Sequence, residues 1–376
     1  MSFFGNDAIN RVNLQAGVQA LSEGAGQLFL LVFLLRAGVP VAGAFLAQAA
    51  IVAIRFIARP LVLPLAVRFG LKPVLIGGAL AMAVQYPILA EVRGVGPALV
   101  ATCLAAALAE VIYYVTRNAY FAAAGDAEHR GKQVAIGQAL SAAANIVAPL
   151  LGAWGLIAVG PRWTFAAVAA VQASSVIPLL GLGNIAVARK APGAWRAARG
   201  AAWLTGLDGW FDAGFLFVWQ LALFRALGQS YSAYGGAMAL AGLAGATASL
   251  AIGRHIDLGG GRRAVALAYG VAALVTLFRA VSLHSPALTA LANAAGGFVM
   301  PLLVPPLATV THNLAKTSPC PLRNKMATEA GWDVGCFLVC IIAATLAQSH
   351  APALLWVLLP LPAAAASAVA LRRYFV

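Results

Sequence analysis

Long apolar runs, separated by short charged or Pro/Gly-containing connections, make up most of the chain. Most runs reach about 20 residues, the length that an α-helix needs to cross a hydrocarbon core of about 30 Å. They lack the ten-residue alternation of transmembrane β-strands. The pattern therefore predicts twelve membrane-spanning helices, near residues 12–36, 40–66, 74–91, 97–123, 133–158, 163–187, 201–226, 232–252, 264–282, 286–311, 326–348 and 352–371.

The composition supports this interpretation. Of the 376 residues, 62% are hydrophobic and 10% are charged, whereas soluble domains carry about 25% charged residues. A chain this apolar needs lipid around much of its surface, and in lipid only helices or closed barrels satisfy their backbone polar groups. We therefore expect an all-α, multi-pass membrane protein whose surroundings are the lipid bilayer.

The net charge of +14 does not indicate a nucleic-acid-binding protein, because the basic residues lie in short clusters between the apolar runs. Twelve spans place both termini on one side of the membrane. Of the 25 Lys and Arg residues, 17 then lie on the side of the termini, five lie at the opposite ends of the spans, and Arg55, Arg59 and Arg117 lie within spans. The positive-inside rule predicts cytoplasmic termini, and we expect a bacterial inner membrane.

One connection divides the chain into two parts with six spans each. Residues 188–200 (ARKAPGAWRAARG) are basic and contain Pro and two Gly residues. We predict a first six-helix half over 1–187, a cytoplasmic linker over 188–200 and a second six-helix half over 201–376.

The connection between spans 8 and 9 carries a recognisable motif. It reads GRHIDLGGGRR over residues 253–263, with Arg254, Asp257, Arg262 and Arg263, and it resembles the cytoplasmic signature loop of the major facilitator superfamily. The equivalent loop in the first half is incomplete, because Val67 replaces the Asp and Leu63 replaces the Gly. Residues 144–153 (ANIVAPLLGA) resemble a degraded form of the Gly/Pro motif of proton antiporters in this family, such as bacterial exporters of drugs and metabolites.

The resemblance implies two pseudo-symmetric six-helix halves and a central cavity lined by helices 1, 4, 7 and 10. Ionisable groups within spans are costly and mark functional sites, and four acids lie on three of these helices. We predict cavity or proton-coupling roles for Glu23, Glu110, Asp208 and Asp212. The alternative is a structural role, in which each acid is neutral and bonded to a neighbouring helix. Asp208 and Asp212 are four residues apart and repel each other if both ionise.

Polar and aromatic residues on the same helices complete the predicted site. Span 1 carries a polar stripe with a period of four, and spans 4, 7 and 10 add further groups. The predicted substrate-binding residues are Gln19, Gln27, Tyr113, Tyr114, Arg117, Trp210 and Asn293.

Two further acids lie in the first turns of predicted span 11. Glu329 and Asp333 are four residues apart and follow a basic loop. Acids at a helix N-terminus are stabilised by the helix dipole, which suffices for a structural role. We predict that they join Asp257, Arg254, Arg262 and Arg263 in a cytoplasmic gate.

These features predict a secondary transporter that works by alternating access. The sequence has no phosphate-binding loop for ATP, no HExxH motif and no clustered His. We therefore expect no cofactor or metal and a proton gradient as the energy source. We also expect a monomer. Its partner is a small-molecule substrate, and we favour export of a cationic or amphiphilic compound. Uptake of an organic anion, with Arg117 as its anchor, is the alternative transport function. A non-transporting receptor or assembly factor on the same scaffold and, least favoured, an intramembrane enzyme are the alternatives from other classes.

Overall fold

The computed structural model describes residues 6–125, 130–253, 261–316 and 318–375, and every element of regular structure in these ranges is helical. The first half contains α1 (Asp7–Ala25), η1 (Gln27–Phe29), α2 (Leu30–Arg36), α3 (Val41–Ala58), η2 (Arg59–Leu61), α4 (Val62–Phe69), α5 (Leu71–Ala90), α6 (Pro97–Ala124), α7 (Arg130–Ala158), α8 (Gly160–Ser174) and α9 (Ile177–Leu180). The second half contains α10 (Ala194–Asp212), η3 (Ala213–Val218), α11 (Trp219–Ala226), α12 (Tyr231–Gly253), α13 (Gly261–Ser282), α14 (Pro286–Gly296), α15 (Val299–Ala315), α16 (Pro321–Gln348), α17 (Ala353–Val357) and α18 (Pro360–Arg372).

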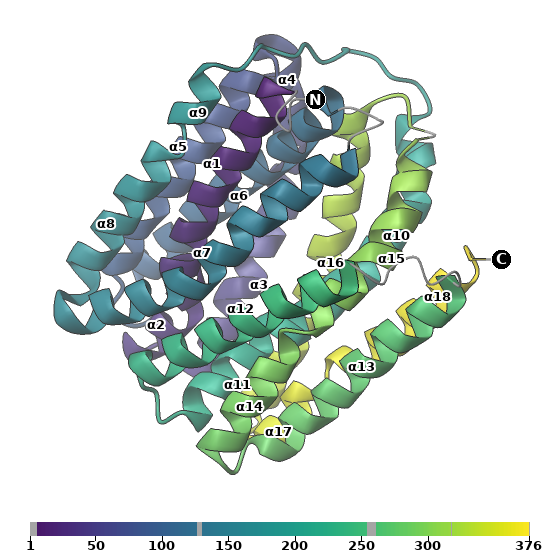
Figure 1. The fold of residues 1–376 in the computed structure, drawn as a ribbon. Helices are drawn as coiled ribbons and strands as arrows, with labels where there is room; N and C mark the ends of the chain where they lie inside the picture. Colours follow the sequence, from purple (N-terminus) through teal and green to yellow (C-terminus); the bar gives the residue numbers. More distant parts are fainter. Residues whose placement is uncertain (1–5, 126–129, 254–260, 317, 376) are drawn as a thin grey trace.

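These elements form an elongated helical bundle (Figure 1). Ten stretches within the described residues are long and apolar enough to cross a membrane. The continuous helix of α10, η3 and α11 and the Ala- and Gly-rich α12 bring the long helical segments to twelve. The predicted all-α membrane fold is therefore confirmed.

Several of the twelve segments are broken near their middle. The first breaks at Gly26, where a Cβ atom would collide with Tyr86 and Val168. The second breaks at Arg59 and Pro60, because proline removes a backbone donor and kinks a helix. Another break falls at Gly296 and Gly297, between α14 and α15. Discontinuous helices near the membrane midplane are typical of transporters.

Three boundaries differ from those predicted. Helix α9 ends at Leu180, not near 187, and Asn184 bonds to the backbone of Phe69 and Lys72 at the end of the bundle. Helix α10 begins at Ala194 and so takes up the last part of the predicted linker. Helix α16 begins at Pro321, because proline suits the first helical position, and this places Glu329 and Asp333 deeper than we expected.

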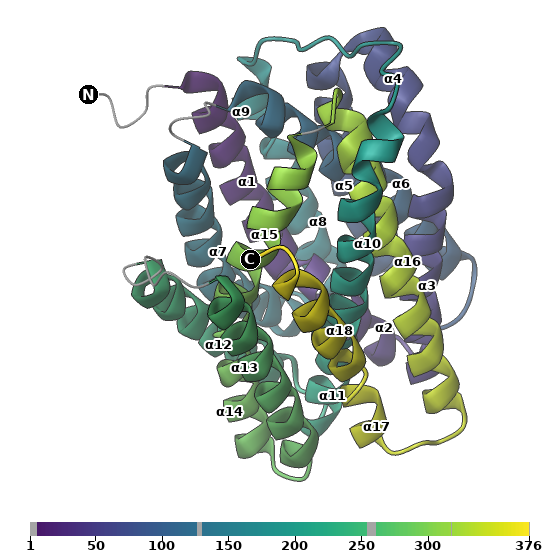
Figure 2. The same ribbon diagram turned by 90° about the vertical axis from the view of Figure 1, so that its right-hand side faces the viewer.

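Two pairs of helices form the most extensive contacts between the halves. Helix α3 packs against α16, and α7 packs against α12; Figure 2 shows α16 between α10 and α3. Small residues permit the second contact, since a Cβ atom on Gly235 or Gly242 of α12 would collide with the backbone of α7 at Pro149 or Asn145. The antiporter-like segment 144–153 therefore lies at the joint between the halves.

The bundle has a linker end, crossed by residues 181–193 at the top of Figure 1, and an opposite far end. At the far end both halves share one apolar core. Toward the linker end one core belongs to the first half but also takes in Leu322 and Met326 of α16, and another belongs to the second half alone. Aromatic contacts join the halves at the far end: the rings of Phe29 and Tyr234 lie 5.5 Å apart, and those of Phe45 and Trp356 lie 5.9 Å apart. This packing closes the far end.

Candidate functional site

A cluster of five charged side chains lies halfway along the bundle and connects the two halves. At its centre is Arg55 of α3, whose guanidinium lies 2.9 Å from Glu110 of α6, 3.1 Å from Asp333 of α16 and 3.6 Å from Glu329 of α16. Arg55 and Glu110 are each only 6% exposed. Three carboxylates from both halves therefore share one guanidinium in a region that excludes most solvent.

The fifth member is Arg59, which bonds to Asp333. Arg59 opens the short turn η2, and Pro60 and the resulting break set its position. Asp333 is 1% exposed and lies more than three turns into α16. We call Arg55, Arg59, Glu110, Glu329 and Asp333 the interhalf cluster. Buried charges are tolerated when they are paired in this way.

The break in the first segment connects to the interhalf cluster. The turn η1 begins at Gln27, whose side-chain amide donates a hydrogen bond of 3.0 Å to Glu110. Glu110 therefore receives Arg55 on one oxygen and Gln27 on the other. The structure thus brings together Glu110 and Gln27, two of the predicted site residues. Their hydrogen bond joins the first membrane span to the fourth.

A second polar network surrounds Glu23 of α1. The hydroxyl of Tyr114 donates a hydrogen bond of 2.5 Å to Oε1 of Glu23, and the Gln19 amide donates one of 3.0 Å to the same oxygen. Gln172 of α8 then donates to Gln19. Tyr113 instead bonds to Gln15. Glu23 thus has hydroxyl and amide donors but no basic partner among the described residues, and its Oε2 receives no hydrogen bond from them.

Asp208 and Asp212 lie on α10, across the bundle from Glu23. The indole of Trp332 donates a hydrogen bond of 3.0 Å to Oδ2 of Asp212, while Asp208 has neither a hydrogen bond nor an ion pair to the part of the chain that the structure describes. The ring of Trp332 also faces Arg55, whose guanidinium carbon lies 5.3 Å from the ring centroid. Trp332 therefore links Asp212 to the interhalf cluster.

Three predicted substrate-binding residues make no direct contact with these networks. Arg117 is half-buried and donates to its neighbour Asn118 at 3.4 Å, and Asn118 in turn donates to Glu329 of the interhalf cluster. The Trp210 indole donates to the carbonyl of Leu359, which ties α10 to the turn before α18. Asn293 is 2% exposed, accepts from Trp219 and donates to the carbonyl of Ala237. Because its amide is occupied on both sides, Asn293 holds three helices together in this conformation and offers no group to a substrate.

The predicted gate has a different arrangement. Arg254 and Asp257 lie outside the described residues. Arg262 bonds to the carbonyl of Arg372 at the exposed linker end, and neither it nor Arg263 pairs with an acid among the described residues. The dipole interpretation requires Glu329 and Asp333 to lie at the N-terminus of a helix. They lie instead more than two turns into α16, which begins at Pro321. Their partners are Arg55 and Arg59. The prediction placed the helix start five residues too late, and for that reason it put both acids too close to the membrane surface.

Arg279 is a functional candidate that the sequence analysis missed. It is 4% exposed, and within the described chain no acid lies beside it. Its guanidinium donates a hydrogen bond of 2.7 Å to the carbonyl of Phe215 and lies over the rings of Phe215 and Trp219, with its central carbon 3.8 and 4.6 Å from their centroids. Phe215 belongs to the π-helical segment η3. A π-turn perturbs the regular hydrogen-bond ladder, and Arg279 caps one of its carbonyls.

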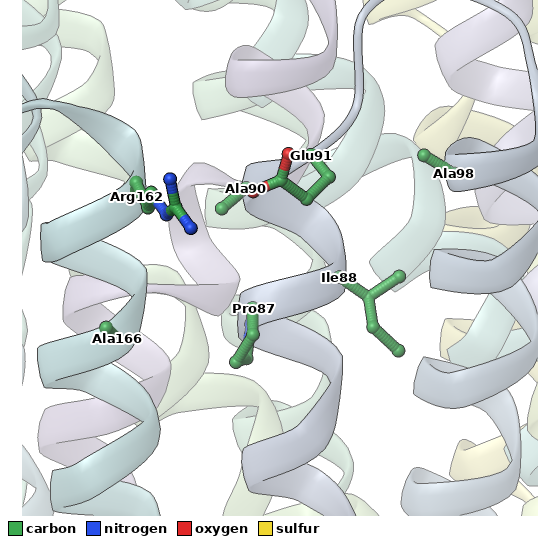
Figure 3. A pocket seen from close by; sticks show the side chains of 7 residues that line it. All are labelled: Pro87, Ile88, Ala90, Glu91, Ala98, Arg162 and Ala166. Carbon is green, nitrogen blue, oxygen red and sulfur yellow. The ribbon is translucent and has the colours of Figure 1, made fainter.

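A surface pocket lies elsewhere, at the far end of the first half. It has a volume of about 450 Å³ and is formed by α5, α6 and α8. Figure 3 shows Arg162 of α8 and Glu91 at the end of α5 on its rim. None of the predicted substrate-binding residues lines it.

Comparison with known families agrees with this architecture. A sequence model of the Major Facilitator Superfamily matches residues 27–319, well over half of the chain. The chain belongs to the major facilitator superfamily. This membership identifies a secondary transporter of a small molecule and an integral multi-pass membrane protein, and it confirms that the chain is not an enzyme. No curated protein matched the chain.

Solved structures of major facilitator transporters share the fold. The crystal structure of the human organic anion transporter MFSD10 (TETRAN) is 18% identical, with a TM-score of 0.69, covering 97% of this chain and 99% of that one. An auto-inhibited peptide transporter of the POT family is 13% identical, with a TM-score of 0.69, covering 98% of this chain and 97% of that one. The POT family transporter PepTSo is also 13% identical, with a TM-score of 0.70 and 98% of each chain covered. Likenesses this distant show the fold alone.

Proposed function

We propose that this major facilitator transporter is proton-coupled and exports a small cationic or amphiphilic compound. One observation carries the proposal: Glu23, Asp208 and Asp212 lie near the middle of the long segments Asp7–Arg36 and 194–226 and have no basic partner among the described residues. All three acids are half-buried. Because a carboxylate that is withdrawn from water without a basic partner is destabilised, each of these groups favours either a proton or a cationic ligand.

The bonding of two of these acids leaves room for a proton. Both donors to Glu23 reach Oε1, and the Trp332 indole reaches only Oδ2 of Asp212. One oxygen of each carboxyl group therefore remains unbonded within the described residues. A proton on that oxygen neutralises the acid and leaves the existing hydrogen bonds in place, as a group that loads and releases protons requires.

The interhalf cluster offers a route from protonation to movement. Arg55 is shared between Glu110 of the first half and Glu329 and Asp333 of the second. A proton on Glu329 or Asp333 would remove one ion pair between the halves. A proton on Glu110 would remove a competing partner of Arg55 and so strengthen its ion pairs with Glu329 and Asp333. In this account the protonation state of the cluster biases alternating access.

The surroundings of Asp212 suit a positively charged substrate. Asp208 and Asp212 lie on one helix face, and the Trp332 ring beside Asp212 already accepts the Arg55 guanidinium on its face. Carboxylates and aromatic faces are the groups that attract organic cations. The likeness of segment 144–153 to the antiporter motif also favours export.

Uptake of an organic anion is the second candidate. It is favoured by the buried Nε atom of Arg117, which has no hydrogen-bond partner within the described residues. One structurally similar protein is named as an organic anion transporter. Arg117 would anchor the anionic group, and the acids would carry the protons.

Transport by purified protein in liposomes tests both candidates. The membrane potential is clamped, and the panel contains tetraphenylphosphonium, ethidium, a dicarboxylate and a dipeptide. Export in exchange for protons predicts that the cations accumulate in liposomes with an acidic interior, and that a proton ionophore abolishes the accumulation. Accumulation of the dicarboxylate or the dipeptide when the exterior is acidic would favour uptake instead. Protein-free liposomes control for leakage.

A further inference from the structure

The pocket at the far end of the first half has charged groups at its rim and apolar groups below them. Glu91 follows the last residue of α5, and Arg162 lies in the first turn of α8. One helical turn deeper along the same helices lie Pro87 and Ala166. Ile88, Ala90 and Ala98 complete the lining. Figure 3 shows the guanidinium and the carboxylate near one level, with Pro87, Ile88 and Ala166 beneath them.

The two charges are not paired with each other or with other side chains. Within the described residues, neither the Glu91 carboxylate nor the Arg162 guanidinium forms an ion pair or a side-chain hydrogen bond. Both side chains are exposed. The pocket thus presents one negative and one positive group across an apolar floor, which is the complement of a zwitterion with an apolar tail.

We propose that this pocket binds the headgroup of a phospholipid with a primary ammonium group, such as phosphatidylethanolamine. The phosphate lies against the Arg162 guanidinium, and the ammonium group donates to the Glu91 carboxylate. The glycerol and the first methylene groups cover Pro87, Ile88 and Ala166. The volume of about 450 Å³ is within the usual range for small-molecule pockets.

The location favours a lipid over a soluble zwitterion. The pocket is on the surface of the bundle, where the ends of α5 and α8 mark the end of the apolar spans. Trp154 and Trp163, which are 64% and 71% exposed, lie on α7 and α8 toward the same end. Tryptophan concentrates at the boundary between membrane and water, so the charged rim lies at headgroup depth.

Lipid binding to the purified full-length chain tests the proposal. Native mass spectrometry measures retention of phosphatidylethanolamine, phosphatidylcholine and phosphatidylglycerol with identical acyl chains. We expect phosphatidylethanolamine to bind about tenfold more tightly than the other two, which is the effect of one charge-assisted hydrogen bond. Phosphatidylcholine has no N–H donor for Glu91, and phosphatidylglycerol brings no positive charge.

Variants of the lining residues test whether a lipid preference arises at this pocket. Glu91→Gln should abolish the preference over phosphatidylcholine, and Arg162→Gln should weaken all three lipids. Ala166→Phe fills the pocket without changing its charge and should also remove the bound lipid. Arg225→Gln is the matched control: it removes an exposed arginine near the far end of the second half and should change nothing.

Three results would overturn the proposal. The pocket is not a lipid site if Glu91→Gln and Ala166→Phe both keep the preference of the parent protein, or if the parent shows none. If free phosphoethanolamine competes as well as the lipid does at equal concentration, the occupant is a soluble zwitterion.

Discussion

At the scale of single residues, the interhalf cluster pairs two buried arginines with acids from distant parts of the chain, and Asp333 is only 1% exposed. The sequence shows that Arg55 and Arg59 lie inside a predicted span, and the cost of intramembrane charge already marks them as candidates. It does not show that their partners are Glu110, 55 residues from Arg55, and Asp333, 274 residues from Arg59. Spacing along one helix predicts neighbours on that helix only. The contact between Gln19 and Glu23, which lie four residues apart in one span, is therefore predictable from the sequence.

The pair of Arg59 and Asp333 gives a prediction at this scale. Asp333→Ala leaves the buried Arg59 without its acid partner and should lower stability by about 3–5 kcal/mol, because an uncompensated buried charge remains. The double variant Arg59→Met, Asp333→Leu should recover most of the loss. Thermal unfolding in detergent gives the comparison.

The control for this cycle is the exposed pair of Arg11 and Asp7, where the aspartate side chain is 76% exposed. Asp7→Ala should change stability by about 0–1 kcal/mol. Equal losses at both sites, or a double variant whose loss is the sum of its single variants, would show that the buried pair is not coupled.

At the scale of helices, the sequence predicts the number of spans well and their internal breaks in part. Gly26, Pro60 and the Gly296–Gly297 pair are residues that commonly interrupt helices, and each break occurs there. The π-helical segment Ala213–Val218 has no such signal. Arg279 of α13 donates a hydrogen bond to the Phe215 carbonyl of this segment. Gly296 leaves room for the Arg279 guanidinium, because a Cβ atom there would collide with it. Tertiary contacts of this kind cannot be read from local propensity.

This arrangement predicts that Arg279 stabilises the π-turn. Arg279→Leu removes the donor to Phe215, and Gly296→Ala pushes the guanidinium aside. Amide hydrogen exchange over residues 213–218 should become about tenfold faster in both variants, the effect of about 1.4 kcal/mol. Gly270→Ala in α13, where a Cβ atom meets nothing within 4 Å, is the control. Unchanged exchange in both variants would mean that η3 holds its form without Arg279.

At the scale of the whole molecule, the division into two six-helix halves and the family are predictable from the spacing of spans and one loop. The halves meet through α3 with α16 and through α7 with α12, and the interhalf cluster lies at the first of these contacts. The cytoplasmic position of the linker end rests on the distribution of basic residues and stays a prediction. Neither the substrate nor the transport direction follows from the fold, since this family transports many compounds on one scaffold.

The central claim is that membrane-embedded acids couple proton movement to substrate movement. The most direct test compares Glu23→Gln and Asp212→Asn with the parent protein in liposomes, using a compound that the parent accumulates under a pH gradient. Both amides mimic the protonated acid and can still accept the hydrogen bonds from Tyr114 and Trp332. The account predicts that exchange of substrate between equal pools continues in at least one variant, while its accumulation driven by the pH gradient is lost. If both variants concentrate the substrate with the pH dependence of the parent, the account is contradicted.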